Sequence, residues 1–342
     1  MTKRSGWLPK RGPSRPERQG VDGDDKLPHG GMGAVRTDGV VRQPGPASGH
    51  IPVMPGEVLE LLNLPQGGIA VDGTMGLAGH SRLMAQCLGA AGHLIGIDRD
   101  AGALAEARKR LEGLSVKLNF LQGNFKDING LLSGIKVPAV DGILLDLGIS
   151  SFQLNNPDRG FAFKEDGPLD MRMDQNSGHP AEDVVHTLSE EELARMIWEF
   201  GEDRFARRIA KAIVYRRAEQ KITTTKQLAD IVLRALPHGY TRGKIHPATR
   251  TFQALRIVVN DELHALAAGL QECFKVLKPG GRLCVIAFHS LEDRIVKNQL
   301  RSWVDQGLGE ALTKKPLRPS EAECEANPRS RSARVRAIQR IA

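Results

Sequence analysis

The sequence predicts an α/β fold with a doubly wound, parallel sheet, and two observations support this prediction. First, short apolar runs alternate with helix-forming segments between residues 50 and 147, and each run is continuous, as expected for strands buried on both faces. Second, the run Ile69–Asp72 is followed by Gly73, Gly76 and Gly79 and then by helix-forming residues. Because glycine permits positive φ and close approach of a ligand, this segment predicts a strand, a tight turn and a ligand-binding helix N-terminus.

The composition fits a cytoplasmic protein with a polyanionic partner. The chain has 342 residues, of which 48 are basic and 40 acidic, and its net charge of +8 favours a nucleic acid partner. Its four cysteines form no C-x-x-C pair and are expected to be reduced thiols. We expect no membrane association, because no apolar run reaches the roughly 18 residues of a membrane span and the N-terminus lacks the apolar core of a secretory signal.

The first α/β segment follows a tail. Residues 1–48 are basic, rich in Gly and Pro and without periodicity, so they are predicted to be disordered. Apolar spacing then predicts, in chain order, a short helix near residues 58–62, a strand at 69–72, a helix near 81–88, a strand at 94–98, a helix near 101–111, a strand near 117–122 and a strand at 141–147. With right-handed crossovers these elements form an α/β sandwich.

An all-helical insertion is predicted after the fourth strand. Residues 148–178 are rich in Gly, Pro and Asp and are expected to form a loop. Several helices follow, because Ser189 and Glu192 form a capping box before an apolar stripe and Thr224 can cap a further helix. We therefore place the helical insertion at residues 155–246.

The α/β pattern then resumes, so residues 49–154 and 247–342 form one discontinuous domain. The elements expected in its second part are a long helix over residues 251–277, a strand over 282–288, a loop over 304–328 and a final strand over 334–341.

Two acids at strand ends are candidate binding residues. Asp98 ends the second strand about 22 residues after Gly76, where a doubly wound fold binds the ribose hydroxyls of an adenosine cofactor. Asp146 ends the fourth strand, beside the topological switch point. Either acid could instead cap a helix or form a salt bridge, but together with the glycine turn they indicate a nucleoside cofactor.

Two other polar clusters are each open to two interpretations. The basic residues of helix 203–219 could bind phosphates or form a solvated face, and the arginine-rich segment 329–340 favours RNA. The acidic loop 166–174 could hold a divalent metal or be closed by salt bridges to Arg159 and Arg172. We favour the salt bridges and expect no metal site.

Several long segments resemble the bacterial small-subunit ribosomal RNA cytosine-N4 methyltransferases. In order, they are 50–53 (HIPV), 141–151 (DGILLDLGISS), 159–161 (RGF), 166–174 (DGPLDMRMD), 246–256 (HPATRTFQALR), 288–297 (FHSLEDRIVK) and 327–332 (NPRSRS). The resemblance implies a class I methyltransferase fold whose helical insertion recognises rRNA. It implies S-adenosylmethionine as the cofactor, the small ribosomal subunit as the partner and a decoding-centre (P-site) cytosine of 16S rRNA as the substrate.

The resemblance also implies a set of site residues. Asp98 would bind the ribose and Phe125 would lie near the adenine. Ala78 departs from the family, which has glycine there, and a left-handed conformation at this alanine would cost roughly 1 kcal/mol. The complete set of cofactor contacts carried over is Ala78, Gly79, His80, Asp98, Phe125, Asp146 and Gln153.

Asp146 is the first candidate for the catalytic residue. An acceptor beside the cytosine N4–H localises the amine lone pair and takes the proton as the methyl group arrives. The segment after Asp146 lacks the two prolines common in amino-group methyltransferases, so His289 or a backbone carbonyl is the alternative acceptor. A nicotinamide dehydrogenase is disfavoured, because its glycine spacing is G-x-G-x-x-G. Another nucleic acid substrate, a catalytically weak ribosome-assembly protein and a homodimer are left open.

Overall fold

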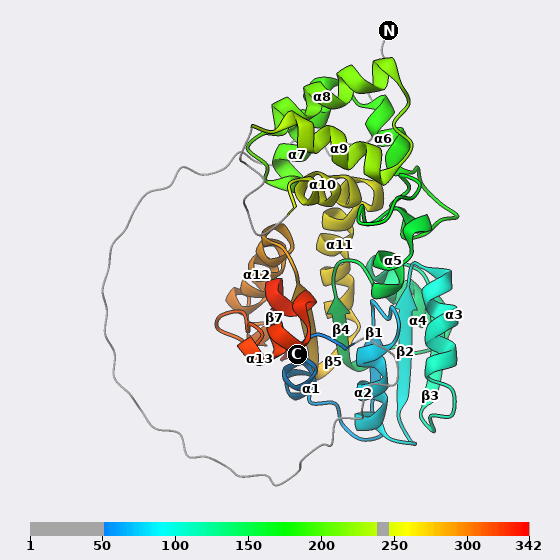
Figure 1. Ribbon diagram of the computed structural model, residues 1–342. Coiled ribbons are helices and arrows are strands. Elements are labelled where there is room, and N and C mark those ends of the chain that lie inside the picture. Colours follow the sequence, from blue (N-terminus) through cyan, green and yellow to red (C-terminus); the bar gives the residue numbers. More distant parts are fainter. Residues whose placement is uncertain (1–50, 238–245, 342) are drawn as a thin grey trace.

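The computed structural model describes residues 51–237 and 246–341, and the tail predicted at residues 1–48 lies outside them. The described residues form an α/β part and a layer of helices at one end of it (Figure 1). None of the helices in these two ranges is long and apolar enough to cross a membrane.

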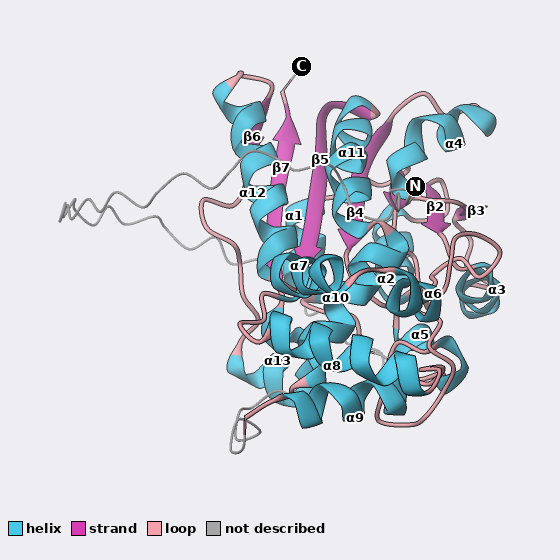
Figure 2. Cartoon of the chain, turned by 90° about the horizontal axis from the view of Figure 1, so that it is seen from above, coloured by secondary structure: helices cyan, strands magenta, loops and turns pink. Residues whose placement is uncertain are grey.

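A seven-stranded sheet with the order β3-β2-β1-β4-β5-β7-β6 forms the centre of the α/β part. Neighbouring strands from β3 to β5 are parallel, whereas β7 is antiparallel to β5 and β6; the arrows of β5 and β7 point in opposite directions in Figure 2. This is the strand order of class I methyltransferases, and it confirms the predicted fold class. The strands are Ile69–Asp72 (β1), His93–Asp98 (β2), Lys117–Gln122 (β3), Val140–Asp146 (β4), Leu277–Ala287 (β5), Gly309–Ala311 (β6) and Arg334–Arg340 (β7).

Helices cover both faces of this sheet. They are α1 (Pro55–Leu62), α2 (Gly79–Leu88), α3 (Ala101–Arg110), α4 (Ile128–Gly134), α11 (Glu262–Lys275) and α12 (Ser290–Asp305). Successive residues of β1 face opposite sides: Ala70 packs in a cluster with α1 and α2, and Val71 in a cluster with α4, α11 and α12. Burial on both faces explains why the strands appear in the sequence as continuous apolar runs.

The helical layer consists of α6 (Ala181–Thr187), α7 (Glu190–Gly201), α8 (Ala206–Glu219), α9 (Thr225–Ala235) and α10 (Ala248–Asn260). The predicted capping box of Ser189 and Glu192 is present at α7, and Thr224 caps α9 together with Gln227. These helices enclose a separate apolar core that includes Ile197, Ile213 and Leu255. Because α10 contributes to this core, the helical layer continues beyond residue 246 to the end of α10.

The prediction of a single long helix over residues 251–277 is wrong. The chain forms α10 and α11 instead, and Asp261 between them adopts a left-handed conformation with φ 50°. The break redirects the chain, because α10 packs in the helical layer while α11 packs against the sheet. Apolar spacing continues across the break, so periodicity alone does not reveal it.

Two segments expected as loops contain regular structure. Residues 148–178 include α5 (Ser151–Leu154) and a 3-10 turn at Pro157–Arg159. Residues 304–328 include β6 and α13 (Glu321–Ala326). These elements are short, and their local sequences carry too few apolar positions to show a period.

Candidate cofactor and acceptor site

A cavity of about 330 Å³ opens at the carboxyl ends of β1, β2 and β4. This edge of the sheet faces the helical layer (Figure 1). The position is the topological switch point, where β1 has β2 on one side and β4 on the other. Residues from all three strand ends, from α11 and from α12 line the cavity.

The glycine turn forms one wall of this cavity. Asp72 ends β1 and organises the turn: one of its oxygens accepts from the Thr74 N–H at 3.2 Å and the other from the Ser81 hydroxyl at 2.6 Å. A larger residue at Gly73 would require Leu145 to move, because a Cβ there would lie 2.5 Å from Leu145 Cδ2. Gly76 has φ 50°, as a turn of this kind requires.

Ala78 adopts the left-handed conformation that the sequence argument considered, with φ 62°. Its N–H donates to the Met75 carbonyl at 2.8 Å, and its side chain is buried behind the turn beside Leu104 and Ala107. Ala78 therefore does not line the cavity, whereas its neighbours Gly79 and His80 do. A cofactor contact from Ala78 stays a prediction without support from the cavity lining.

Asp98 ends β2 with its carboxylate fixed from both sides. One oxygen accepts from the Gly76 N–H at 2.7 Å and the other from the Asp100 N–H at 2.9 Å. Burial raises the pKa of Asp98 to about 6, although these backbone hydrogen bonds favour the ionised form. The carboxylate lines the cavity in the position expected for a ribose acceptor.

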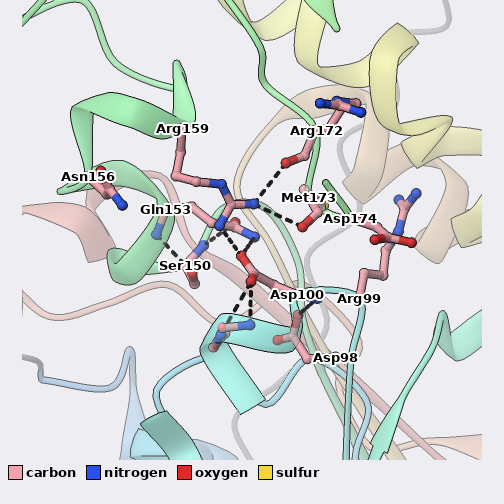
Figure 3. Close-up of polar contacts among 12 residues, drawn as sticks. Asp98, Arg99, Asp100, Ser150, Gln153, Asn156, Arg159, Arg172, Met173 and Asp174 are labelled. Atoms are coloured by element: carbon pink, nitrogen blue, oxygen red, sulfur yellow. Dashed lines mark hydrogen bonds and ion pairs between the residues drawn. The ribbon is translucent and has the colours of Figure 1, made fainter. Parts of the chain in front are cut away.

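Phe125 and Gln153 also line the cavity. The Phe125 ring packs on the backbone of α11 at Gly269, where an added Cβ would lie 2.4 Å from the ring. The Gln153 amide accepts from the Ser150 N–H at 3.2 Å and donates to Asp100 at 3.0 Å (Figure 3). Both residues are therefore held in place by neighbours that lie far away in the sequence.

Asp146 ends β4 beside the turn, and its backbone N–H donates to the Thr74 hydroxyl at 2.6 Å. In the described part of the chain, its buried Oδ1 has no hydrogen-bond partner, and Oδ2 lies 3.7 Å from His80 Nε2. Burial, followed by the charges of Asp72 and Glu292, raises the pKa of Asp146 to about 8. Asp146 is thus a carboxyl group that retains its proton readily and has an oxygen available to a ligand.

His289 is less suited to the role of acceptor. Its ring caps α12: Nδ1 accepts from the Glu292 N–H at 3.4 Å, and Nε2 lies 3.1 Å from Glu292 Oε1. His289 does not border the cavity, although Phe288 and Glu292 do. The His289 ring therefore contacts Glu292, and the structure does not bring His289 to Asp146.

Sequence reasoning missed a group of charged residues that line the cavity, namely Arg256, Glu262 and Glu292. Arg256 on α10 donates to both oxygens of Glu262 at 2.8 Å and lies 4.0 Å from Glu292. Although burial favours the neutral acid, the His289 hydrogen bond and the charges of His289 and Arg256 hold the pKa of Glu292 below its usual value. Glu262, His289 and Glu292 offer ligand atoms within 4.8 Å of one another, but Arg256 already occupies Glu262.

The acidic loop 166–174 is closed by its own contacts. Asp170 binds the Arg172 guanidinium through both oxygens at 2.8 and 2.9 Å, and Asp174 accepts from the Ser177 hydroxyl at 2.8 Å. Asp166 accepts from the backbone N–H of Lys226 at 3.0 Å. The pair of Asp170 with Arg172 confirms one of the two predicted salt bridges. The other is wrong, because the Arg159 guanidinium pairs with Asp100 at the start of α3 and not with an acid of this loop.

The two basic segments divide into exposed and inward-facing residues. On α8, the exposed side chains are Arg207, Arg208, Lys211 and Arg216, together with Arg204 just before the helix. Arg217, in contrast, donates to the carbonyls of Val185 and Leu188. In the C-terminal segment, Arg334 and Arg336 pair with Asp293, whereas Arg329 reaches the cavity edge beside Ser151.

The residues present fit S-adenosylmethionine. The glycine turn lines the cavity with Gly73, Gly76 and Gly79, which have no side chains to occupy it. Asp98 presents a fixed carboxylate for the ribose, and Phe125 supplies an apolar surface for the adenine. Asp146 lines the same cavity, and its buried Oδ1 has no hydrogen-bond partner among the described residues.

Comparisons with known proteins identify the family of the chain. The model of the MraW methylase family matches residues 47–341. The chain is 51% identical to ribosomal RNA small subunit methyltransferase H of Syntrophotalea carbinolica (strain DSM 2380 / NBRC 103641 / GraBd1), over 85% of this chain and 98% of that protein. It is 54% identical to the protein of that name from Deinococcus deserti (strain DSM 17065 / CIP 109153 / LMG 22923 / VCD115), over 85% of this chain and 93% of that protein.

Among solved structures, a putative rRNA-methylase from Clostridium thermocellum matches with a TM-score of 0.43 and 11% identity, over 86% of this chain and 98% of that chain. The family model covers the whole α/β part and the helical layer, from before β1 to the end of β7. This chain therefore belongs to the MraW methylase family.

Proposed function

We propose that this protein transfers a methyl group from S-adenosylmethionine to the N4 amine of a P-site cytosine in the decoding centre of 16S rRNA. The observation that carries this proposal is the buried, unpartnered Oδ1 of Asp146, in the same cavity as the glycine turn and Asp98. A fixed ribose acceptor and an unsatisfied acceptor atom in one cavity suit a cofactor and an amine placed side by side. The names of the relatives, which act on small-subunit rRNA, support the choice of substrate.

The cofactor, when bound, supplies an electrophilic methyl group on a sulfonium cation. The chain must then hold N4 in line with that methyl group and take up a proton from the amine. The Asp146 carboxylate accepts a hydrogen bond from N4–H, which localises the nitrogen lone pair, and it receives the proton as the new C–N bond forms. Without cofactor, burial raises the pKa of Asp146 to about 8, so the group is largely protonated at neutral pH. The positive charge of a bound sulfonium would lower this pKa and favour the carboxylate that accepts the proton.

The helical layer is the proposed rRNA-binding region, within residues 155–246 as first expected and extended by α10. The exposed arginines and lysine of α8 supply a face for phosphates, and Arg329 at the cavity edge can meet the backbone of an unstacked nucleotide. We place the reaction in the cytoplasm, where small ribosomal subunits are made. A homodimer stays a prediction that sedimentation of the purified protein would test.

The test is transfer of a labelled methyl group from S-adenosylmethionine to small ribosomal subunits that lack the modification, followed by digestion and identification of the nucleoside by mass. N4-methylcytidine from one decoding-centre position would support the proposal. Label in another nucleoside, or in competing DNA or RNA, would show that the substrate is a different one. Binding of cofactor and subunit without any incorporation would favour a ribosome-assembly protein with a weak site.

A further inference from the structure

Arg159 is a buried arginine that the proposed reaction does not use. It ends the 3-10 turn after α5, is only 4% exposed and does not border the cavity. We propose that Arg159 is a positioning residue that fixes the ribose end of the cofactor site and ties it to the segment 171–173 beneath the helical layer. The proposal rests on the proposed function only for the identity of the cofactor.

Arg159 reaches the ribose end through Asp100 (Figure 3). Its Nη1 donates to Asp100 Oδ2 at 2.5 Å, and Gln153 donates to the same oxygen at 3.0 Å. Asp100 Oδ1 caps α3 by accepting from two backbone N–H groups, and the Asp100 N–H donates to Asp98 at 2.9 Å. The direction of the Asp98 carboxylate therefore depends on Asp100, and Asp100 is held by Arg159.

The other end of the guanidinium holds the segment 171–173. Nη2 donates to the carbonyls of Arg172 and Met173, both at 2.9 Å. Asn260, the last residue of α10, accepts from the Met173 N–H and donates to the Met171 carbonyl, each at 2.8 Å. Met173 lines the cavity, so the same arginine contacts the support of Asp98 and a second segment that borders the cavity.

The backbone of this segment needs such support. Met171 is buried and has φ 62°. This left-handed conformation is energetically unfavourable for any residue that has a side chain. The Met171 N–H donates to the Arg159 carbonyl at 3.1 Å, so Arg159 contacts the segment through its backbone as well as its side chain. Contacts from Arg159 on one side and Asn260 on the other hold the strained residue in place.

Lysine cannot replace this arginine. The guanidinium donates to one carboxylate and two carbonyls at once in a planar fork, whereas an ammonium group is a compact charge on a flexible stem. Removing the charge would also leave Asp100 buried without its ionic partner. We therefore expect Arg159→Lys to keep the fold and weaken positioning, and Arg159→Met to weaken it further.

The test is calorimetric binding of S-adenosylmethionine and of S-adenosylhomocysteine to the full-length protein. For Arg159→Met we expect the Kd of both ligands to rise about tenfold, because both carry the ribose that Asp98 binds. Arg159→Lys should raise both by a smaller factor. A purely electrostatic role would change the affinity of the sulfonium cation and leave that of the neutral product nearly unchanged, which would overturn the proposal.

Arg172→Met is the matched control. Arg172 lies in the same segment and pairs with Asp170, but its side chain does not contact Asp100. Its Kd values should stay within about twofold of the wild type. If Arg159 only stabilised the fold, its variants would bind fewer ligands per chain with an unchanged Kd, and an unchanged Kd for Arg159→Lys would overturn the proposal even where Arg159→Met does not fold.

Hydrogen exchange provides a second readout. Cofactor should slow exchange of the Met173 amide in the wild type and slow it less in Arg159→Lys, because the link between the ribose end and this segment is weakened. Equal protection in both proteins would contradict the link. Neither binding nor exchange requires an rRNA substrate, so this proposal and the proposed methyl acceptor can fail independently.

Discussion

The acids that end β2 and β4, Asp98 on the cofactor side of the cavity and Asp146 on the acceptor side, differ in how completely they are partnered. On the cofactor side, both oxygens of Asp98 accept backbone hydrogen bonds and both oxygens of Asp72 are bonded within the turn. On the acceptor side, Asp146 keeps a buried oxygen without a partner in the described structure. In the proposed roles, the group that binds the ribose is fixed in advance by its neighbours, whereas the group that takes the proton keeps an unsatisfied atom.

The comparison is tested most strongly by Asp146→Asn. The amide keeps the shape of the side chain but cannot take the N4 proton, so we expect methyl transfer to fall about 10²–10⁴-fold. The Kd of S-adenosylmethionine should change little by comparison. Asp141→Asn is the control, because Asp141 lies at the other end of β4 and pairs with Lys278 away from the cavity. Full turnover by Asp146→Asn would remove the carboxylate from the mechanism.

Asp98→Asn tests the cofactor side. Loss of a charged acceptor for the ribose should weaken S-adenosylmethionine binding about 10–100-fold. Turnover at saturating cofactor should be affected much less than by Asp146→Asn, because Asp98 does not contact the reacting atoms. Calorimetry and initial rates over a range of cofactor concentrations give the two quantities. A variant that binds normally but turns over slowly would reverse the assignment of the two sides.

The unsatisfied acid also predicts a pH-dependent stability. Burial raises the pKa of Asp146 from 3.8, the ordinary value of an aspartate, to about 8 in the folded protein, so between these values the folded protein holds a proton that the unfolded chain has lost. The contribution of Asp146 to the stability of the cofactor-free protein therefore falls as pH rises from about 4 to 8. Asn does not titrate, so Asp146→Asn should be more stable than the wild type at pH 8 by up to several kcal/mol, because each unit of pKa corresponds to about 1.4 kcal/mol. The expected rise in Tm is several °C.

At pH 4 the two proteins should melt together, because Asp146 is then protonated in the folded state. A Tm difference that is the same at both ends of this pH range would show that the effect comes from packing and not from titration.

The smallest effect is expected for Ala78→Gly. Glycine would relieve the left-handed strain at φ 62° and gain at most about 1 kcal/mol, partly offset by the loss of a buried methyl group. The Kd of S-adenosylmethionine should stay the same, because Ala78 does not line the cavity. Thermal melting and calorimetry of the same preparation test both statements. A lower Kd of S-adenosylmethionine for the variant would show that the Ala78 backbone takes part in binding.

The cofactor side could be predicted largely from the sequence, because its residues are close together in the chain. The strand Ile69–Asp72 has the predicted bounds, and the acid at the end of β2 lies where the glycine turn indicated. Strand, turn and helix start are local properties that glycine spacing and apolar runs report directly.

Asp146 itself ends a predicted strand, but the contacts that support the two sides of the cavity could not be predicted in the same way. Arg256, Glu262 and Glu292 meet through the fold of α10, α11 and α12, and Arg159 meets Asp100 across 59 residues of sequence. No local pattern reports such contacts. The break at Asp261 could not be predicted for a related reason. The usual sequence signal for a left-handed residue is glycine, but an aspartate adopts this conformation here.

That break has a consequence for protein engineering. Because α10 belongs to the helical core and α11 to the sheet, the natural junction between the two units on the C-terminal side is Asp261, not the end of the region first assigned as an insertion. A chimera that exchanges substrate-binding helices between relatives should therefore be joined at this residue. A join at residue 246 would leave α10 behind with its apolar face exposed, and with it Arg256, the cation that neutralises the acids beside the cavity.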